Sequence, residues 1–280
     1  MKKVAIQGIA GSFHDIAAKE YFKGEEIEII GCETFKDVFD TIKKDSSVLG
    51  AVAIENTIAG SLLGNHNLLK QSGLKIAGEQ KLRIKHNLAA IPGQKLSDIK
   101  EVQSHPIALM QCGDFLQSNK HIKAIESDDT ASSAKRVANE GNLGVAAICG
   151  ETAAQIYGLE ILEKGIETNK RNFTRFLIIG DPWSVEELNK GKSTNKASLT
   201  FTLPHEEGSL AKVLSILSYY NMNLSKIESM PLIGREWEYQ FFISLSFSQY
   251  VRYTQAINAI MPLTKELQIL GEYEEGNQTM

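Results

Sequence analysis

The chain has 280 residues, of which 42% are hydrophobic and 23% charged, and its formal net charge at pH 7 is −4. This is the composition of an ordinary globular protein, with enough residues for two domains and a proper core. Because Lys and Arg are dispersed along the chain, we expect neither a nucleic-acid surface nor a patch for anionic membranes.

The N-terminal segment 1–8 is basic and then apolar, but its apolar run is too short for a secretory signal. No segment approaches the roughly 18 apolar residues of a membrane span. We therefore predict a cytoplasmic protein without membrane association. The cysteines Cys32, Cys112 and Cys149 are isolated, and neither they nor the histidines have metal-ligand spacing. We expect no disulfide, no metal site and no organic cofactor.

Strand and helix signals alternate over the first 180 residues, which is typical of parallel sheets covered by helices. Strands are predicted at 4–8, 27–31, 49–54, 101–104, 145–148 and 175–180. Helices are predicted at 34–44, from Pro106, from Asp129 or Thr130 to Ala138, and up to Tyr157. A break at 78–92 indicates two α/β lobes, roughly 1–77 plus 170–182, and 78–169. We expect the final strand to return to the first lobe and to leave a cleft between the lobes.

The polar segment 183–196 is predicted to be a linker. Residues 197–275 beyond it have a different pattern. Strands are predicted at 197–203, 224–229, 237–247 and 267–273, and helices at 210–217 and 251–261. The order βαββαβ is that of a ferredoxin-like fold, an antiparallel sheet with helices on one face. Its exposed edge and the apolar strand at 237–247 predict pairing with a second copy of the chain.

Five loops at strand ends are candidate ligand sites, because ligands of open α/β sheets bind beside the ends of strands. Residues 8–13 form a Gly-rich turn before a helix, whose N–H groups suit an anion, although the turn is also needed structurally. It is not a Walker loop, because Gly-Lys-Ser/Thr is missing. Residues 55–61 follow a buried strand and are almost all polar or small, which favours a binding loop over a simple turn.

The other three loops contain hydroxyl, amide and imidazole groups with more than one possible role. In the segment 103–106, Ser104 is either a helix N-cap or a ligand contact, and His105 is either a packing residue or catalytic. Capping alone would also explain the segment 128–130. The segment 172–176 crowds an Asn, a Thr and an Arg at the start of a strand, and the Arg either binds a ligand or pairs with a surface carboxylate.

These groups do not match the common catalytic sets. No Ser/His/Asp triad order, no glycosidase-like carboxylate pair and no acidic partner of a Rossmann turn stands out. The residues alone therefore indicate a two-lobed α/β receptor for a small anion, rich in hydroxyl and amide groups, followed by a βαββαβ module.

Several segments of the chain follow one another in an order that is typical of a known protein family. They are 8–13, Glu55-Asn56-Thr57 with Gly60, Ser104-His105-Pro106 with Gln111-Cys112, Asp129-Thr130, Ala146-Ala147-Ile148, Tyr157-Gly158-Leu159 and 172–176. In this order the chain resembles the prephenate dehydratase family, and the most specific match is the Thr-Arg-Phe signature within 172–176. The C-terminal module resembles an ACT domain through Gly208-Ser209-Leu210 and the segment 227–231.

The chain departs from the family pattern at five positions. Ile9 stands where Pro is usual, His14 where Ser is frequent, and Ile107 where Gln is common. In the module, Met230 stands in place of the usual regulatory Arg, and Ser209 in place of the usual Ala. None of these changes removes a presumed catalytic group, whereas Met230 bears on how strongly phenylalanine is sensed.

The resemblance implies a two-lobed catalytic domain like the periplasmic binding proteins, in which prephenate loses carbon dioxide and hydroxide to give phenylpyruvate. Neutral donors suit this reaction, because the hydroxide must be hydrogen-bonded while the charge of the departing carboxylate must not be over-stabilised. The implied catalytic residues are Thr174, as donor to the leaving hydroxyl, with Asn56, Ser104 and Gln111. The implied substrate-binding residues are Ser12, Phe13, Glu55, Ser61, His105, Thr130, Asn172, Phe173 and Arg175.

The resemblance also implies feedback inhibition by L-phenylalanine in a homodimer or tetramer. The effector would bind at an interface between modules, near Gly208, Leu210, Asn221, Leu224, Glu228 and Ser229. On this hypothesis, deletion of the residues after about Gly180 uncouples inhibition from catalysis. Two alternatives remain open: an arogenate dehydratase, whose motifs are much the same, and a non-catalytic sensor of an amino acid or an anion.

Overall fold

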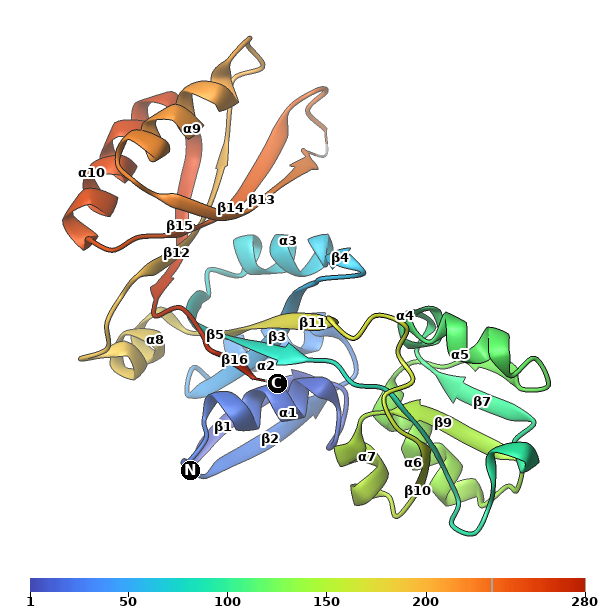
Figure 1. Cartoon of the computed structure of the whole chain (residues 1–280). Helices are drawn as coiled ribbons and strands as arrows, with labels where there is room; N and C mark the ends of the chain where they lie inside the picture. Colours follow the sequence, from blue (N-terminus) through green and yellow to red (C-terminus); the bar gives the residue numbers. More distant parts are fainter. Residues whose placement is uncertain (233, 280) are drawn as a thin grey trace.

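The first lobe is built on a mixed sheet (Figure 1). The structure is a computed structural model that describes residues 1–232 and 234–279. The strands of this sheet lie in the order β16 (Gln278–Thr279), β5 (Lys75–Arg83), β11 (Phe173–Gly180), β3 (Val48–Asn56), β1 (Lys2–Gln7) and β2 (Ile27–Cys32), and β4 (Gly60–Ser61) pairs with β3. The helices of the lobe are α1 (Phe13–Tyr21), α2 (Phe35–Lys44), α3 (Leu63–Ser72) and α8 (Pro182–Asn189).

The second lobe contains a smaller sheet with helices around it. Its strands lie in the order β10 (Glu160–Glu163), β6 (Asn87–Ala90), β9 (Val145–Cys149), β7 (Glu101–Ser104) and β8 (Lys123–Glu126). Its helices are α4 (Pro106–Gln111), α5 (Gly113–Ser118), α6 (Thr130–Glu140) and α7 (Glu151–Ile156), and a 3-10 turn spans Leu96–Asp98. The strand β7 is parallel to β8 and β9, whereas β6 is antiparallel to β9 and β10.

The chain crosses between the lobes twice, and the first crossing lies later in the sequence than predicted. Residues 78–83 belong to β5 of the first lobe, where Gly78 pairs with Ile178 of β11, so the boundary is at 84–86 instead of residue 78. The apolar pattern of β5 is interrupted by Glu79 and Gln80, which are nevertheless buried. The strand β11 returns to the first lobe between β5 and β3, as predicted for the final strand.

The predicted strands and helices are present, with bounds that differ by at most two residues. The predicted linker 183–196 differs from the structure, because the helix α8 occupies its first half. Asp181 accepts from the backbone N–H of Trp183, and Pro182 stands at the first helical position, where its missing N–H costs nothing. Val185 of this helix packs into the core of the first lobe. Among the described residues, no helix is long and apolar enough to cross a membrane.

The third module confirms the predicted ferredoxin-like order. Its elements follow as β12 (Lys196–Thr202), α9 (Ser209–Tyr219), β13 (Asn223–Pro231), β14 (Tyr239–Ser246), α10 (Tyr250–Ile260) and β15 (Lys265–Tyr273). The antiparallel strands lie in the order β13-β14-β12-β15. The apolar strand predicted at 237–247 is β14, and both of its edges are paired within the sheet, with β13 and β12. The edge strands are β13 and β15.

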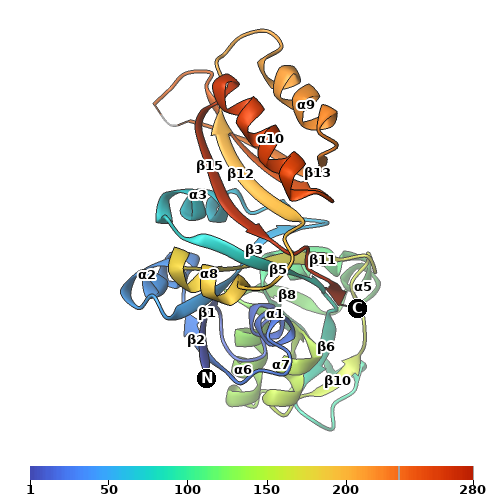
Figure 2. The ribbon, with the colours of Figure 1, turned by 90° about the vertical axis from the view of Figure 1, so that its left-hand side faces the viewer.

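The two faces of the module sheet have different partners (Figure 2). The helices α9 and α10 cover one face and enclose a core that includes Phe201 and Ile243. The other face packs on the first lobe, where Phe242 and Tyr273 share a core with Ile76 and residues of β3 and β11. At Gly271 a Cβ atom would lie 2.5 Å from the carbonyl oxygen of Ile76, so β15 approaches β5 too closely for a side chain. The module and the first lobe therefore share one hydrophobic core.

His66 of α3 lies at this shared core. The residue is buried, its ring lies 5.0 Å from that of Phe242, and its Nε2 has no hydrogen-bond partner within the described part of the chain. Burial, together with the nearby charge of Lys226, lowers the pKa of His66 from 6.5 to about 3, although Glu55 acts in the opposite direction. The imidazole is therefore neutral at pH 7.

We expect His66 to make the free energy of unfolding depend on pH. Because the folded-state pKa is depressed, the unfolded chain binds more protons below pH 6.5, and stability is lost as the pH falls toward 3. One proton corresponds to about 1.4 kcal/mol per pH unit at most. Denaturant titrations at pH 7, 6 and 5 should show a shallower dependence for His66→Phe, and a slope equal to that of the wild type would contradict the prediction.

Candidate active site

A cavity of about 330 Å³ lies in the cleft between the two lobes, as the sequence predicts. The first lobe contributes residues of β3, β11 and α1, and the second lobe contributes residues of α4 and the start of α6. The polar lining residues are Gln7, His14, Asn56, Ser61, His86, His105, Gln111, Asp129, Thr130 and Thr174. The apolar lining residues are Phe13, Phe35, Ala53, Ala59, Leu62, Ile84, Ile107, Ala108 and Phe176.

The lobes touch each other at the Gly-rich loop before α1. The hydroxyl of Tyr157 donates to the carbonyl oxygen of Ala10 at 2.9 Å. A Cβ atom on Gly11 would lie 2.9 Å from the Cα of Ala153, and Gly11 also has a φ of 86°, which favours glycine. This glycine is therefore needed for lobe contact and backbone conformation, which is the structural role that the sequence left open.

Thr174 and Asn56 lie opposite each other on β11 and β3, at the floor of the cavity. The Asn56 side-chain oxygen accepts from the backbone N–H groups of Ile58 and Ala59, which fixes the orientation of the amide. Its Nδ2 consequently donates to the hydroxyl oxygen of Thr174 at 2.9 Å and to the side-chain oxygen of Asn172 at 2.8 Å. With its oxygen accepting from Asn56, the Thr174 hydroxyl is left to donate its hydrogen into the cavity.

Gln111 of α4 connects the second lobe to this pair. Its Nε2 donates to the side-chain oxygen of Asn56 at 3.3 Å, and its Oε1 accepts from Asn172 at 2.8 Å. The Nε2 of His86 lies 2.9 Å from the same Oε1, so the imidazole carries its proton on Nε2. Burial lowers the pKa of His86, which keeps the ring neutral. The result is a closed array of amide and imidazole groups behind the Thr174 hydroxyl.

His14 and His86 line the cavity but do not belong to the predicted set. The Nε2 of His14 accepts from the backbone N–H of Ala53 at 3.3 Å, and burial lowers its pKa from 6.5 to about 4. The ring is therefore neutral and carries its proton on Nδ1. His14 was visible only as a departure from the family pattern, and His86 as a lone histidine where the chain crosses between lobes.

Several predicted residues lie outside the cavity. The hydroxyl of Ser104 donates to the carbonyl oxygen of Ile148 at 2.7 Å and is fully buried, so it holds β7 to β9 and does not face the cleft. Ser12 is the N-cap of α1, where its side chain accepts from the backbone N–H of Asp15. Both residues are buried and neither is among the lining residues of the cavity, which differs from the predicted substrate contacts.

Glu55 and Arg175 face away from the cavity. Side chains alternate along a strand, so the neighbours of Asn56 and Thr174 point to the opposite face of the sheet. There the two residues form an ion pair at 3.2 Å, and Arg175 also pairs with Glu79 at 2.6 Å. The guanidinium is therefore directed toward the third module and not toward a ligand, which differs from the predicted substrate contact.

The remaining predicted residues divide into lining and supporting groups. Phe13, Ser61, His105 and Thr130 line the cavity. Asn172 lies behind it in the amide array, and the carbonyl oxygen of Phe173 accepts from the Asn56 side chain at 3.2 Å. The structure thus brings Thr174, Asn56 and Gln111 together with these four lining residues.

The electrostatics of the cavity are dominated by neutral groups. Among the described residues, its lining includes no Lys or Arg, and its single carboxylate is Asp129, which accepts from the backbone N–H of Ser132 as the N-cap of α6. The histidines His14 and His86 are neutral at pH 7 because of their lowered pKa values. The cleft can therefore offer several uncharged hydrogen-bond donors to one small molecule.

The residues predicted to bind an effector lie in the third module. Gly208 has a φ of 74° and precedes α9, Leu210 lies in the first turn of α9, and Asn221 has a φ of 62° in the turn before β13. Leu224, Glu228 and Ser229 lie on the edge strand β13. Glu228 already has a partner within the chain, because its carboxylate accepts from the hydroxyl of Ser61 at 2.6 Å.

Comparison with known proteins decides the family. The model of the prephenate dehydratase family matches residues 4–183, which include both lobes. The chain belongs to the prephenate dehydratase family. Arogenate dehydratase/prephenate dehydratase 1 of Arabidopsis thaliana is 33% identical, and the match covers 97% of this chain and 71% of that protein. The bifunctional chorismate mutase/prephenate dehydratase of Escherichia coli K12 is 30% identical, with 98% and 71% covered.

Solved structures of similar proteins share the whole fold of this family member. The prephenate dehydratase of Staphylococcus aureus has a TM-score of 0.81 at 26% identity, covering 98% of this chain and all of that chain. GqqA, described as a novel type of quorum quenching acylase, has a TM-score of 0.85 at 27% identity, covering 98% of both chains. The prephenate dehydratase of Arthrobacter aurescens in complex with L-Phe has a TM-score of 0.85 at 24% identity, covering 99% and 91%.

Proposed function

We propose that the chain converts prephenate to phenylpyruvate, with release of carbon dioxide and water, as a step of phenylalanine biosynthesis in the cytoplasm. The observation that carries the proposal is the Thr174 hydroxyl, oriented by Asn56 in a cavity lined by neutral donors. Family membership supports a dehydratase. The chemistry of the cavity supports the particular reaction, because the ring carboxylate of prephenate must leave while the ring hydroxyl is hydrogen-bonded.

In the proposed mechanism Thr174 donates to the hydroxyl that leaves the ring. The C–O bond and the bond to the ring carboxylate break, the electron pair of the latter bond completes the aromatic ring, and the departing hydroxide takes up a proton from solvent to become water. A threonine is a weak acid, so its contribution is a strong hydrogen bond in the transition state. Asn56 and Gln111 hold the donor in place, and Phe13, Ser61, His105 and Thr130 contact the substrate.

The absence of Lys and Arg from the described cavity lining fits the loss of carbon dioxide. A cation beside the ring carboxylate would stabilise the ground state more than the transition state, in which that charge moves into the ring. The proposed reaction uses only side chains of this chain. We propose that neither a metal ion nor an organic cofactor takes part.

Two other activities are suggested by the similar proteins. Arogenate is the amino analogue of prephenate, and the same donors would serve its dehydration. An acylase would require an activated nucleophile, but no hydroxyl that lines the cavity is hydrogen-bonded to a histidine among the contacts of residues 1–232 and 234–279. We therefore favour dehydration over acyl transfer as the activity of this chain.

The ratio of kcat/KM for prephenate and arogenate tests the proposed substrate. The proposal expects a clear preference for prephenate, measured by release of phenylpyruvate against release of phenylalanine. A preference for arogenate would make the chain an arogenate dehydratase. Specific binding of either compound without product would favour the remaining alternative, a sensor.

We further propose that the third module is an ACT domain that binds L-phenylalanine and inhibits the reaction in a homodimer or tetramer. The support is the βαββαβ fold, the resemblance of 208–210 and 227–231 to ACT motifs, and the position of β13 at the edge of the module sheet. The effector would bind near Gly208, Leu210, Asn221, Leu224, Glu228 and Ser229.

We expect L-phenylalanine to lower activity about 5- to 150-fold at saturation, the range of typical allosteric couplings. The inhibition should not be simply competitive with prephenate, because the effector residues lie outside the cavity. Calorimetry and initial rates on the full chain measure binding and inhibition together. No binding at millimolar L-phenylalanine, with unchanged activity, would contradict the regulatory role.

A further inference from the structure

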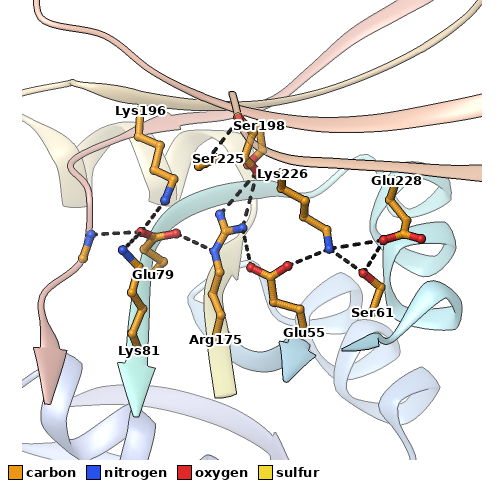
Figure 3. A network of polar contacts seen from close by, with 12 residues as sticks. Glu55, Ser61, Glu79, Lys81, Arg175, Lys196, Ser198, Ser225, Lys226 and Glu228 are labelled. Atoms are coloured by element: carbon orange, nitrogen blue, oxygen red, sulfur yellow. Dashed lines mark hydrogen bonds and ion pairs between the residues drawn. The ribbon is translucent and has the colours of Figure 1, made fainter. Parts of the chain in front are cut away.

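A network of buried and partly buried polar contacts joins the third module to the strands that carry the cavity floor (Figure 3). Arg175 lies at its centre, and its Nε donates to Glu79 at 2.6 Å. Its terminal nitrogens donate to Glu55 at 3.2 Å and to the hydroxyl of Tyr273 at 2.9 Å. Burial alone would raise the pKa of Glu55, but the charges of Arg175 and Lys226 hold that pKa below its usual value. The Glu55 carboxylate is therefore ionised at neutral pH.

Lys226 of β13 contacts both Glu55 and Ser61 (Figure 3), and Ser61 lines the cavity. Its ammonium lies 2.6 Å from a carboxylate oxygen of Glu55 and also donates to the hydroxyl of Ser61. Ser61 donates in turn to the carboxylate of Glu228, which lies 3.7 Å from the same ammonium. The Lys226 side chain is only 7% exposed, whereas the side chains of Glu55 and Glu228 are 30% and 34% exposed, so water screens these contacts in part.

The residues that Lys226 and Glu228 contact stand at the two ends of one cavity loop. Glu55 immediately precedes Asn56, which orients Thr174, and the two side chains point to opposite faces of β3. Ser61 ends the loop and itself lines the cavity. A displacement of either end would therefore move the Asn56 amide relative to the Thr174 hydroxyl.

We propose that Lys226 and Glu228, although they belong to the C-terminal module, are positioning residues of the cavity, because they hold the loop 56–61 through Glu55 and Ser61. The expected effect on kcat rests on the proposed function, whereas the expected effect on the structure of the loop does not. Without the ammonium of Lys226, the carboxylates of Glu55 and Glu228 would face each other across Ser61 without a cation between them. Their repulsion would shift the loop, and the aligned donor would be lost.

The kinetic test compares Lys226→Met with Lys226→Arg and with Lys212→Met, in the absence of L-phenylalanine. Lys212 is an exposed lysine of α9, on the far face of the module. We expect Lys226→Met to lower kcat about 10- to 100-fold with a smaller change in KM, the scale of a small misplacement of catalytic groups. Lys226→Arg should restore most of kcat, and Lys212→Met should match the wild type. A wild-type kcat for folded Lys226→Met would overturn the proposal.

A second variant keeps the proposal testable if Lys226→Met does not fold. Glu228→Met removes the acceptor of Ser61 but leaves the ion pair between Lys226 and Glu55. We expect a smaller loss of kcat, and unchanged kinetics in this variant would remove Glu228 from the proposed role.

Hydrogen exchange of the loop tests the inference without any activity assay. The backbone N–H groups of Ile58 and Ala59 donate to the Asn56 side chain, and that of Thr57 donates to Phe173. Peptides covering 55–62 should exchange faster in Lys226→Met than in Lys212→Met, with no matching change in α6. Equal exchange would overturn the inference. Faster exchange in a protein that does not turn over prephenate would leave the positioning intact and count against the proposed function.

Discussion

Thr174→Ala should fold normally and lose about 100- to 1,000-fold in kcat, the cost of one transition-state hydrogen-bond donor. The loss follows from geometry, because the Thr174 hydroxyl is held by Asn56 at 2.9 Å and faces the cavity. The substitution leaves Asn56 paired with Asn172, so no buried amide loses its last partner. KM should change little, since the hydroxyl acts mainly in the transition state.

Thr174→Ser is the matched variant for this prediction, because it keeps the hydroxyl and removes only a methyl group. It should retain much more activity than the alanine variant. Rates under saturating prephenate, with circular dichroism to verify folding, measure both. Near-wild-type kcat for Thr174→Ala would remove this residue from the mechanism.

Glu79→Ala is expected to lower the free energy of unfolding by about 3–5 kcal/mol, the usual cost of removing one partner from a buried ion pair. The carboxylate is fully buried and contacts Arg175 at 2.6 Å and Lys196 at 2.8 Å. Burial would raise the pKa of Glu79, but these two cations outweigh it and lower that pKa. Without the carboxylate, two cations would remain buried with reduced compensation.

Glu275→Gln provides the control for Glu79→Ala. Glu275 contacts the same Lys196 at 3.2 Å, but its side chain is 40% exposed, so its loss should cost no more than about 1 kcal/mol. Denaturant unfolding of both variants at pH 7 gives the comparison. Equal destabilisation by the two substitutions would show that the burial of Glu79 is not the reason for the contribution of its ion pairs to stability.

The same contacts change the expectation for a truncated chain. Deletion after about Gly180 was expected to separate inhibition from catalysis. The structure argues against this, because the deletion removes Lys196 and exposes the core that Phe242 and Tyr273 share with the first lobe. We expect the truncated chain to be unstable. Point substitutions at the effector residues are the better way to separate the two properties.

Much of the fold could be predicted because local patterns agree with the tertiary structure. Period-two alternation at 237–247 and helical periodicity at 34–44 mark real elements, β14 and α2. β5 was missed because Glu79 interrupts its apolar pattern. Its counter-ions, Arg175 and Lys196, are 96 and 117 residues away in the sequence, so nothing local marks this carboxylate as buried.

The candidate site was only partly predictable for a similar reason. Thr174, Asn56 and Gln111 were found through their motifs, but Arg175 shares a motif with Thr174 and faces the other way. Both faces of β11 are buried, so hydrophobicity does not show which side chains reach the cavity. Lone residues such as His86 have no sequence signal, because the role of His86 depends on its contact with Gln111, which lies 25 residues away in the sequence.

The most direct test of the central claim is the reaction itself, followed with the full chain after exhaustive treatment with EDTA. Neutral donors in the cleft predict that the protein converts prephenate to equal amounts of phenylpyruvate and carbon dioxide at its full rate. Binding of prephenate without product would contradict the account. So would activity that is lost with EDTA and restored by one particular metal ion.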